Sequence, residues 1–346
     1  MDRKEFFGEM RMLKKIGLFL IFIVIIGYFS CKEKMKLLHP ILPSTEIIFV
    51  RYNPFKPFNG YSLWGMDRDG KNQVKLLSKQ KLILTPSWSI DGKKIMFVYA
   101  AGIWIIDTTT MKINKIPIKQ DIKVSENACW LSNSQQIVFT KTNEREIYMI
   151  DISGKSLTKL PIVAKSIHYI TCSPIENKIF ISSLEENGYK IYITDNKGKK
   201  IEQLTGDFSS TSCEGSPCIS LDGELIAFNN RIMRKGSKIV LQNLKTKESY
   251  EILSFLHPIE QANSICFSSS KKKLVFAFAP IEIYKLTGRF SNDIYSINID
   301  GKNLKNLTNT PDWDESSPSW RPSCKGAESG SDSILSGTIL ACDFRY

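Results

Sequence analysis

The segment Ile294-Tyr295-Ser296-Ile297-Asn298 decides the fold of this chain, because it returns in altered form at five earlier places. Each copy is a short hydrophobic stretch that ends in an acidic or amide residue and leads into a turn. The six copies begin 40, 44, 44, 48 and 55 residues apart, at Leu63, Ile103, Ile147, Ile191, Ile239 and Ile294. A period of about 40–50 residues built from short strands is typical of β-propeller blades rather than of helical solenoids. The sequence therefore predicts a propeller.

Each repeat can hold four strands. In the second repeat, Asp91-Gly92 supplies the positive φ angles that a tight hairpin turn needs. The flanking runs are short and rich in Ile, Val, Phe and Tyr, which strands favour. The four strands expected in this repeat are residues 84–88, 94–98, 103–107 and 113–118. Almost nothing between residues 46 and 320 shows a helical period, so we expect an all-β domain.

The repeated region starts and ends in the middle of a blade. The stretch from Glu46 to Val50 matches a second strand with no first strand before it, and the stretch from Glu315 to Trp320 matches a first strand with no second strand after it. We expect the two ends to complete one blade, with three strands from residues 46–77 and one from residues 315–320. This joint would close a ring of six four-stranded blades and protect the sheet edges.

The run from Ile294 to Thr308, followed by Pro318-Ser319-Trp320, resembles the repeat of TolB-type propellers. That repeat reads roughly I-Y-x-M-D-x-D-G, then L-T, then P-x-W-S-P-D-G and I-x-F. Its tryptophan position holds Trp88, Trp130 and Trp320 in three repeats and Cys172, Cys218 and Cys266 in the other three. The resemblance covers about 275 residues. It implies the fold and a periplasmic protein–protein role, although the family performs that role with an additional N-terminal domain.

The first 30 residues have the pattern of an export signal. Lys14-Lys15 precede an uncharged, mostly apolar run over residues 16–29, and Ser30-Cys31 follow. This order is typical of a secretory signal, and Cys31 resembles the lipid-modified cysteine of bacterial lipoproteins. Simple secretion and a retained apolar anchor are the alternatives. We expect a signal over 1–30, a linker over 31–45, the propeller over 46–322, and a tail of unknown structure over 323–346.

The chain is basic, with a net charge of +12, or about +10 without residues 1–30, which carry five basic and three acidic groups. The excess is mostly lysine spread over turns. One interpretation is attraction to anionic lipids, acidic glycans or nucleic acid. We favour the other, in which lysines simply keep the turns solvated. Nucleic acid is not an expected partner of an exported protein.

The eight cysteines do not predict a disulfide framework. Seven remain after Cys31, an odd number, so a complete set of internal disulfides is impossible. The three cysteines at the tryptophan position are expected to be small buried apolar residues. Cys129 adjoins Trp130 and should face the other side of its strand. Cys324 and Cys342 could pair in the tail, and no Cys or Cys/His spacing predicts a structural zinc.

One set of polar residues is a candidate metal site. The innermost strands of a propeller line its channel, so Glu126, His168 and Glu214, from neighbouring blades, would face the axis, with Asp314 and Glu315 near the joint. Two carboxylates and an imidazole are suitable ligands for a divalent ion. These three residues belong to a set four positions before the tryptophan position, namely Leu84, Glu126, His168, Glu214, Ala262 and Ser316. The alternative is that they are solvated at the channel mouth, and an error of one residue in register would turn them away.

Catalysis is not expected, and no catalytic residue is assigned. The G-x-S-x-G pentapeptide of propeller-capped serine peptidases does not occur in the sequence, and of the three histidines His39 lies in the linker. Lyases that resemble this fold use several histidines around the channel. We therefore expect a cofactor-free, monomeric scaffold that binds envelope proteins, anchored through Cys31 and facing the periplasm or the cell surface. The alternatives are a carbohydrate- or metal-binding receptor that uses the channel, and a degenerate hydrolase or lyase.

Overall fold

The structure, a computed structural model, describes residues 35–323 except for short internal gaps. The gaps are 55–59, 80, 143–145, 163–165, 187, 199–200, 206–211, 233–234, 258–259 and 290, and the side chains of 201, 212–215, 232 and 286–287 are also left undescribed. The expected signal, Cys31 and the tail from Cys324 onward lie outside the described residues. Within the described part, no helix has the length and hydropathy that crossing a bilayer requires.

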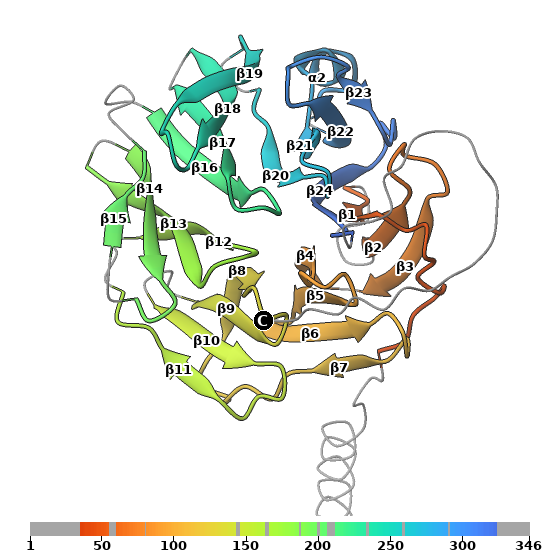
Figure 1. The fold of residues 1–346 in the computed structure, drawn as a ribbon. Coiled ribbons are helices and arrows are strands. Elements are labelled where there is room, and N and C mark those ends of the chain that lie inside the picture. Colours follow the sequence, from red (N-terminus) through yellow and green to blue (C-terminus); the bar gives the residue numbers. More distant parts are fainter. Residues whose placement is uncertain are drawn as a thin grey trace, which may run out of the picture. The chain divides into compact units, whose positions relative to one another are not determined.

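Six antiparallel sheets of four strands form a ring (Figure 1). Blade 1 consists of β24 (Asp314–Trp320), β1 (Ile47–Tyr52), β2 (Tyr61–Met66) and β3 (Val74–Lys79). Blade 2 holds β4 (Ile83–Trp88), β5 (Lys94–Tyr99), β6 (Gly102–Asp107) and β7 (Ile113–Lys115), and blade 3 holds β8 (Val124–Trp130), β9 (Gln136–Lys141), β10 (Ile147–Asp151) and β11 (Leu157–Lys159). Blade 4 holds β12 (Ile167–Cys172), β13 (Lys178–Glu185), β14 (Gly188–Asp195) and β15 (Ile201–Gln203). Blade 5 holds β16 (Ser212–Ile219), β17 (Leu225–Ile232), β18 (Gly236–Asn243) and β19 (Ser249–Phe255), and blade 6 holds β20 (Asn263–Phe267), β21 (Lys273–Phe278), β22 (Asp293–Asn298) and β23 (Lys305–Asn306). The six-bladed all-β prediction is confirmed.

A phenylalanine in the second strand of every blade anchors the core. These six side chains are fully buried, and they are Phe49, Phe97, Phe139, Phe180, Phe228 and Phe276. Each is flanked by buried aliphatic residues that alternate between the two faces of the sheet, so each blade packs against both of its neighbours. Burying one such ring removes roughly 150–250 Å² of side-chain surface from water. The repeat in the sequence is therefore a repeat of inter-blade packing.

Blade 1 closes the ring as the repeat predicts. β24 pairs antiparallel with β1, so that Trp320 lies opposite Ile47 and Glu315 lies opposite Arg51. Three strands of this blade come from the N-terminal side of the domain and one comes from its C-terminal side. The pairing of β24 with β1 satisfies the backbone groups along the edge of each strand. Without it the ring would be open at this blade.

One element was not expected from the sequence. The short helix α2 (Ile281–Thr287) lies between β21 and β22, and it accounts for the longest spacing between repeats. Pro280 precedes the helix, Gly288 ends it in a left-handed conformation, and Glu260 accepts a hydrogen bond from the N–H of Ile281 at 2.8 Å. A helix of two turns carries too little apolar periodicity to be recognised in a sequence.

Candidate functional site

An axial pocket of about 250 Å³ lies where the six innermost strands converge. Every blade contributes residues to it from the last part of its first strand, and five of the six also contribute from the turn that follows. None of the described residues that line the pocket is charged, and none is a histidine. They are proline, serine, threonine, cysteine, aromatic and aliphatic residues, together with Asn127. A mostly apolar wall with a few hydroxyl and indole groups is the usual composition of a ligand site.

The innermost strands bulge where they line this pocket. A register shift interrupts the pairing of the first and second strands in all six blades. In four of them a residue other than glycine takes a positive φ in the innermost strand, and these residues are Thr85, Ser216, Ser264 and Ser317. Bulges re-aim side chains and strained backbone gathers at functional sites. The repeated bulge therefore shapes the wall of the pocket.

The tryptophans of the repeat differ in how their indole N–H groups are used. Trp130 Nε1 donates to the carbonyl oxygen of Ser87 at 3.2 Å, across the junction of blades 2 and 3. Trp88 and Trp320 are 3% and 7% exposed, yet neither indole N–H has an acceptor in the described part of the chain. The hydroxyls of Thr85 and Ser87 are buried without a partner as well. An unpartnered buried polar group costs about 1–3 kcal/mol. All four residues line the pocket, on blades 1 and 2.

Cysteines on four consecutive blades also line the pocket. Cys129 and Cys172 form a disulfide between the innermost strands of blades 3 and 4, with their Cα atoms 6.0 Å apart. The prediction that Cys172 is a simple apolar residue is therefore wrong. The innermost strands of neighbouring blades converge toward the axis. Cys129, one position before the tryptophan position of blade 3, can therefore reach Cys172 at the tryptophan position of blade 4. Cys218 and Cys266 are free thiols, and they are half-buried.

Two of the residues expected to bind a metal, Glu126 and His168, are not among those that line this pocket. Glu126 and His168 are exposed on β8 and β12, and the His168 ring lies 4.7 Å from that of Tyr189. The side chain of Glu214, on β16, lies outside the described set. Among the described side chains there is no group of three or more His, Cys, Asp or Glu that could hold a metal ion. The metal site with Glu214 stays a prediction.

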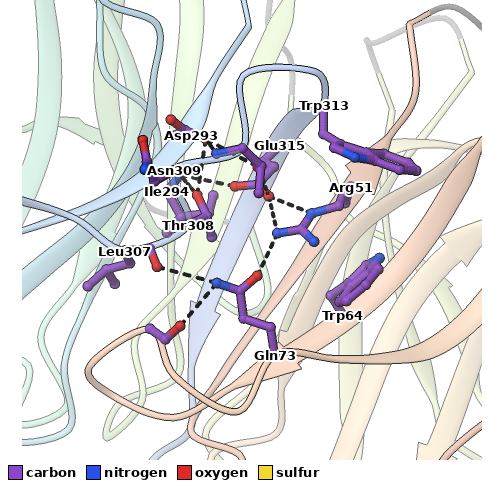
Figure 2. A network of polar contacts seen from close by, with 12 residues as sticks. Arg51, Trp64, Gln73, Asp293, Ile294, Leu307, Thr308, Asn309, Trp313 and Glu315 are labelled. Atoms are coloured by element: carbon purple, nitrogen blue, oxygen red, sulfur yellow. Dashed lines mark hydrogen bonds and ion pairs between the residues drawn. The ribbon is translucent and has the colours of Figure 1, made fainter.

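Asp314 and Glu315 lie at the joint of the ring, as expected, and both are buried. Glu315 belongs to a polar network there (Figure 2). Arg51 Nε donates to Glu315 Oε1 at 2.6 Å, and the guanidinium carbon lies 4.3 Å from the ring centre of Trp64. The Tyr52 hydroxyl donates to Asp314, which raises the pKa of Tyr52 in addition to the larger effect of burial. The sequence could not indicate these pairs, because their members lie more than 260 residues apart.

Glu315 also joins blade 1 to blade 6. Its carboxylate accepts hydrogen bonds from the Thr310 hydroxyl at 2.9 Å and from the Ile294 N–H at 3.3 Å. Burial raises the pKa of Glu315, whereas the charge of Arg51 and the hydroxyls of Thr308 and Thr310 lower it, and the net direction is upward. The network is thus a structural joint, and we assign it no ligand.

Three comparisons place the chain among known proteins. No family model matches it. A stretch of 106 residues is 32% identical to the Tol-Pal system protein TolB of Alcanivorax borkumensis, and this stretch is 29% of the chain and 24% of that protein. The crystal structure of TolB from Acinetobacter baumannii has a TM-score of 0.68 at 23% identity, over 81% of this chain and 67% of that one. The domain has the fold of the TolB β-propeller.

The sequence match to TolB is limited in extent, since it spans about a quarter of the curated relative's length. An oligogalacturonate lyase from Vibrio parahaemolyticus has a TM-score of 0.52 at 11% identity, over 79% of this chain and 84% of that one. Likeness at this identity concerns the fold alone, and one fold can serve several functions. What this propeller does must therefore be argued from its own site.

Proposed function

We propose that this protein is a binding module of the bacterial cell envelope, exported and held at a membrane through Cys31, whose axial pocket takes an uncharged segment of a partner protein. The observation that carries the proposal is the pocket itself, with its uncharged wall and its unpartnered indole N–H groups at Trp88 and Trp320. Backbone carbonyl oxygens of an inserted segment would be suitable acceptors for those donors. The partial match to TolB supports a protein partner.

The size of the pocket favours a segment rather than a folded partner. Its volume of about 250 Å³ lies just below the range of roughly 300–1,000 Å³ that is usual for small-molecule sites. A few side chains of an extended segment fit such a space. An uncharged wall disfavours charged side chains, because burying an unpaired charge is costly.

The Cys129–Cys172 disulfide supports export. Disulfides persist in oxidising compartments such as the bacterial periplasm and are rare in the cytosol. Together with the apolar run over 16–29, this bond favours the envelope as the location. We infer that Cys31 is acylated and that the propeller acts as a monomer without a cofactor.

A pair of photo-crosslinking positions tests whether a protein binds at the pocket. Ile175, 56% exposed, follows β12 in a turn at the pocket end of the innermost strands, whereas Leu82, 47% exposed, precedes β4 at the opposite face of the ring. A photoreactive amino acid at residue 175 should crosslink a discrete envelope protein in living cells, and one at residue 82 should not. Equal crosslinking from both faces, or none from either, would rule out the pocket as the binding site.

The anchor is tested separately with Cys31→Ala. If Cys31 carries the acyl chains of a mature lipoprotein, the variant should move from the membrane fraction to the soluble envelope fraction, because a single chain gives only marginal binding and stable anchoring needs more than one. Unchanged membrane association would instead indicate a retained apolar helix. Either result leaves the pocket proposal to be judged on the crosslinks.

An oligosaccharide is the second candidate ligand, since the three tryptophans that line the pocket offer aromatic faces and indole donors. A glycan array with the purified protein separates the two candidates. Saturable binding of one oligosaccharide class that is lost in Trp320→Ala would favour the carbohydrate receptor. The expectation that the chain is not an enzyme stays a prediction.

A further inference from the structure

Cys218 and Cys266 form a thiol pair inside the ring. They occupy the same position of the repeat on β16 and β20, the innermost strands of two neighbouring blades. Each side chain is close enough to shift the pKa of the other, and both line the axial pocket. A small reagent that enters the pocket can therefore meet two sulfur atoms at once.

The ring already contains one covalent link of this kind. The Cys129–Cys172 disulfide joins blades 3 and 4, and the thiol pair bridges the junction of blades 5 and 6. Both sulfur pairs face the same pocket. A covalent link between innermost strands of neighbouring blades is therefore compatible with the ring, and in the existing bond the Cα atoms are 6.0 Å apart. The thiol pair differs from that bond in register, because Cys129 stands one position before the tryptophan position whereas Cys218 and Cys266 both occupy it.

The surroundings of the two sulfur atoms are unequal. Hydrogen bonding to Cys218 lowers the pKa of Cys266, burial opposes this, and the N–H of Trp320, 3.3 Å from the Cys266 sulfur, lowers it further. The same contact between the sulfurs, together with burial, raises the pKa of Cys218. Thiolates are the nucleophiles of thiol–disulfide exchange. Cys266 is thus placed to react first and Cys218 second.

We propose that Cys218 and Cys266 are a redox site, a half-buried dithiol that a small disulfide entering the axial pocket converts into a second inter-blade disulfide. The inference does not depend on the proposed partner protein. It concerns only the two thiols, their contact and their access through the pocket.

The exchange balances in two steps. The Cys266 thiolate attacks one sulfur of the reagent, the S–S bond of the reagent breaks, and its first half leaves as a thiolate that takes up the proton released by Cys266. Cys218 then loses its proton and attacks the Cys266 sulfur, and the second half of the reagent leaves as a thiol. Two electrons pass from the cysteines to the reagent, which ends as two thiols. The reverse reaction, with excess thiol, restores the dithiol.

The test uses the full chain in redox buffers of bis(2-hydroxyethyl) disulfide and 2-mercaptoethanol. Samples are quenched with acid, free thiols are alkylated in denaturant, and unreduced digests are analysed by mass spectrometry. We expect the amount of the crosslinked Cys218–Cys266 peptide pair to rise in one two-electron transition as the ratio of bis(2-hydroxyethyl) disulfide to 2-mercaptoethanol increases. Fragment ions must assign the bridge to Cys218, because Cys213 lies on the same tryptic peptide. The Cys129–Cys172 peptide pair serves as the internal reference.

Two variants test the order of the steps. Cys218→Ser should leave Cys266 as a mixed disulfide with mercaptoethanol, whereas Cys266→Ser should leave Cys218 largely unmodified at the same buffer ratio. Loss of the Cys129–Cys172 crosslink in a variant would show that it has not folded, and the wild-type titration alone then decides. The proposal is overturned if wild-type Cys218 and Cys266 stay alkylated, or carry separate mixed disulfides, in every buffer that preserves the Cys129–Cys172 bond.

Discussion

Glu315 on β24 and Arg51 on β1 form a salt bridge that solvent does not reach. Their side chains are 0% and 6% exposed, and the Arg51 Nε–Glu315 Oε1 distance is 2.6 Å. The pair lies at the joint where the two ends of the domain meet, and Glu315 continues the network into blade 6 (Figure 2). The joint therefore contains a buried ion pair in addition to its strand pairing.

Removing one partner of this pair should destabilise the domain strongly. Arg51→Met leaves the Glu315 carboxylate without its counter-charge, and such a loss costs about 3–5 kcal/mol. Arg68→Met is the matched control, because Arg68 pairs with Glu46 at 2.9 Å but is 52% exposed, and exposed pairs contribute about 0–1 kcal/mol. Urea unfolding of both variants provides the measurement. Similar losses in both would show that burial does not matter at the joint.

The stability of the domain should respond to pH through Glu315. Its pKa is raised in the folded protein above the ordinary value of 4.5. A raised folded-state pKa gives stabilisation that is fully present below the unfolded pKa and is lost as the pH rises through the folded pKa. Relative to Glu315→Gln, which cannot ionise, the wild type should therefore lose unfolding free energy as the pH rises above the ordinary glutamate pKa of 4.5 and through the higher pKa of folded Glu315. A difference that is constant with pH, or that changes with the opposite sign, would contradict this.

The ring should not survive the loss of its last strand. Deleting residues 314–346 removes β24, exposes the edge of β1 and takes Trp320 out of the core, so we expect aggregation or loss of cooperative unfolding. Deleting only residues 324–346 leaves every described strand in place and should be far milder. The comparison is made by thermal unfolding with light scattering. Equal damage from both deletions would assign the tail to the ring.

Part of this architecture could be predicted from the sequence, and the reasons for success and failure are physical. The blades and their closure could be predicted, because strands repeat a local pattern of turns and buried side chains such as Phe97. The Arg51–Glu315 pair could not, because nothing local links residues that far apart. The Cys129 prediction considered only the two faces of its own strand, and it missed the neighbouring blade that supplies Cys172.

The candidate site likewise depends on contacts between blades that a local sequence pattern does not show. The position of the repeated tryptophan was identified, but the repeat does not show which indole N–H groups find acceptors. Glu126 and His168 have side chains that can bind a metal, whereas the described pocket is lined by uncharged residues from the next positions of the same strands. Uncharged pockets leave little trace in a sequence, since their residues resemble those of a core.

Two glycines with positive φ separate backbone strain from steric contact. A Cβ atom at Gly70, where φ is +85°, would lie 2.3 Å from the Leu307 carbonyl oxygen of blade 6, whereas a Cβ at Gly288, where φ is +70°, would meet no atom within 4 Å. Gly288→Ala should cost about 1–2 kcal/mol from strain alone. Gly70→Ala should cost clearly more, because the turn of blade 1 must move away from blade 6. Equal losses of unfolding free energy in the two variants, measured by chemical unfolding, would show that the backbone at Leu307 moves away from a Cβ at residue 70 without a cost.

The last prediction concerns the indole donors of the pocket. Trp320→Phe removes an N–H that has no acceptor among the described residues, whereas Trp130→Phe removes one that donates to the Ser87 carbonyl oxygen at 3.2 Å. Both lose similar ring area, so Trp130→Phe should destabilise the domain by about 1 kcal/mol more. If the free N–H groups bind the inserted segment, crosslinking from residue 175 should instead fall in Trp320→Phe and persist in Trp130→Phe. The variant that loses more stability is thus expected to lose less crosslinking, and this distinguishes a binding role of the indole N–H from a packing role. If crosslinking instead falls more in Trp130→Phe, the less stable variant, than in Trp320→Phe, the tryptophans act as core residues only.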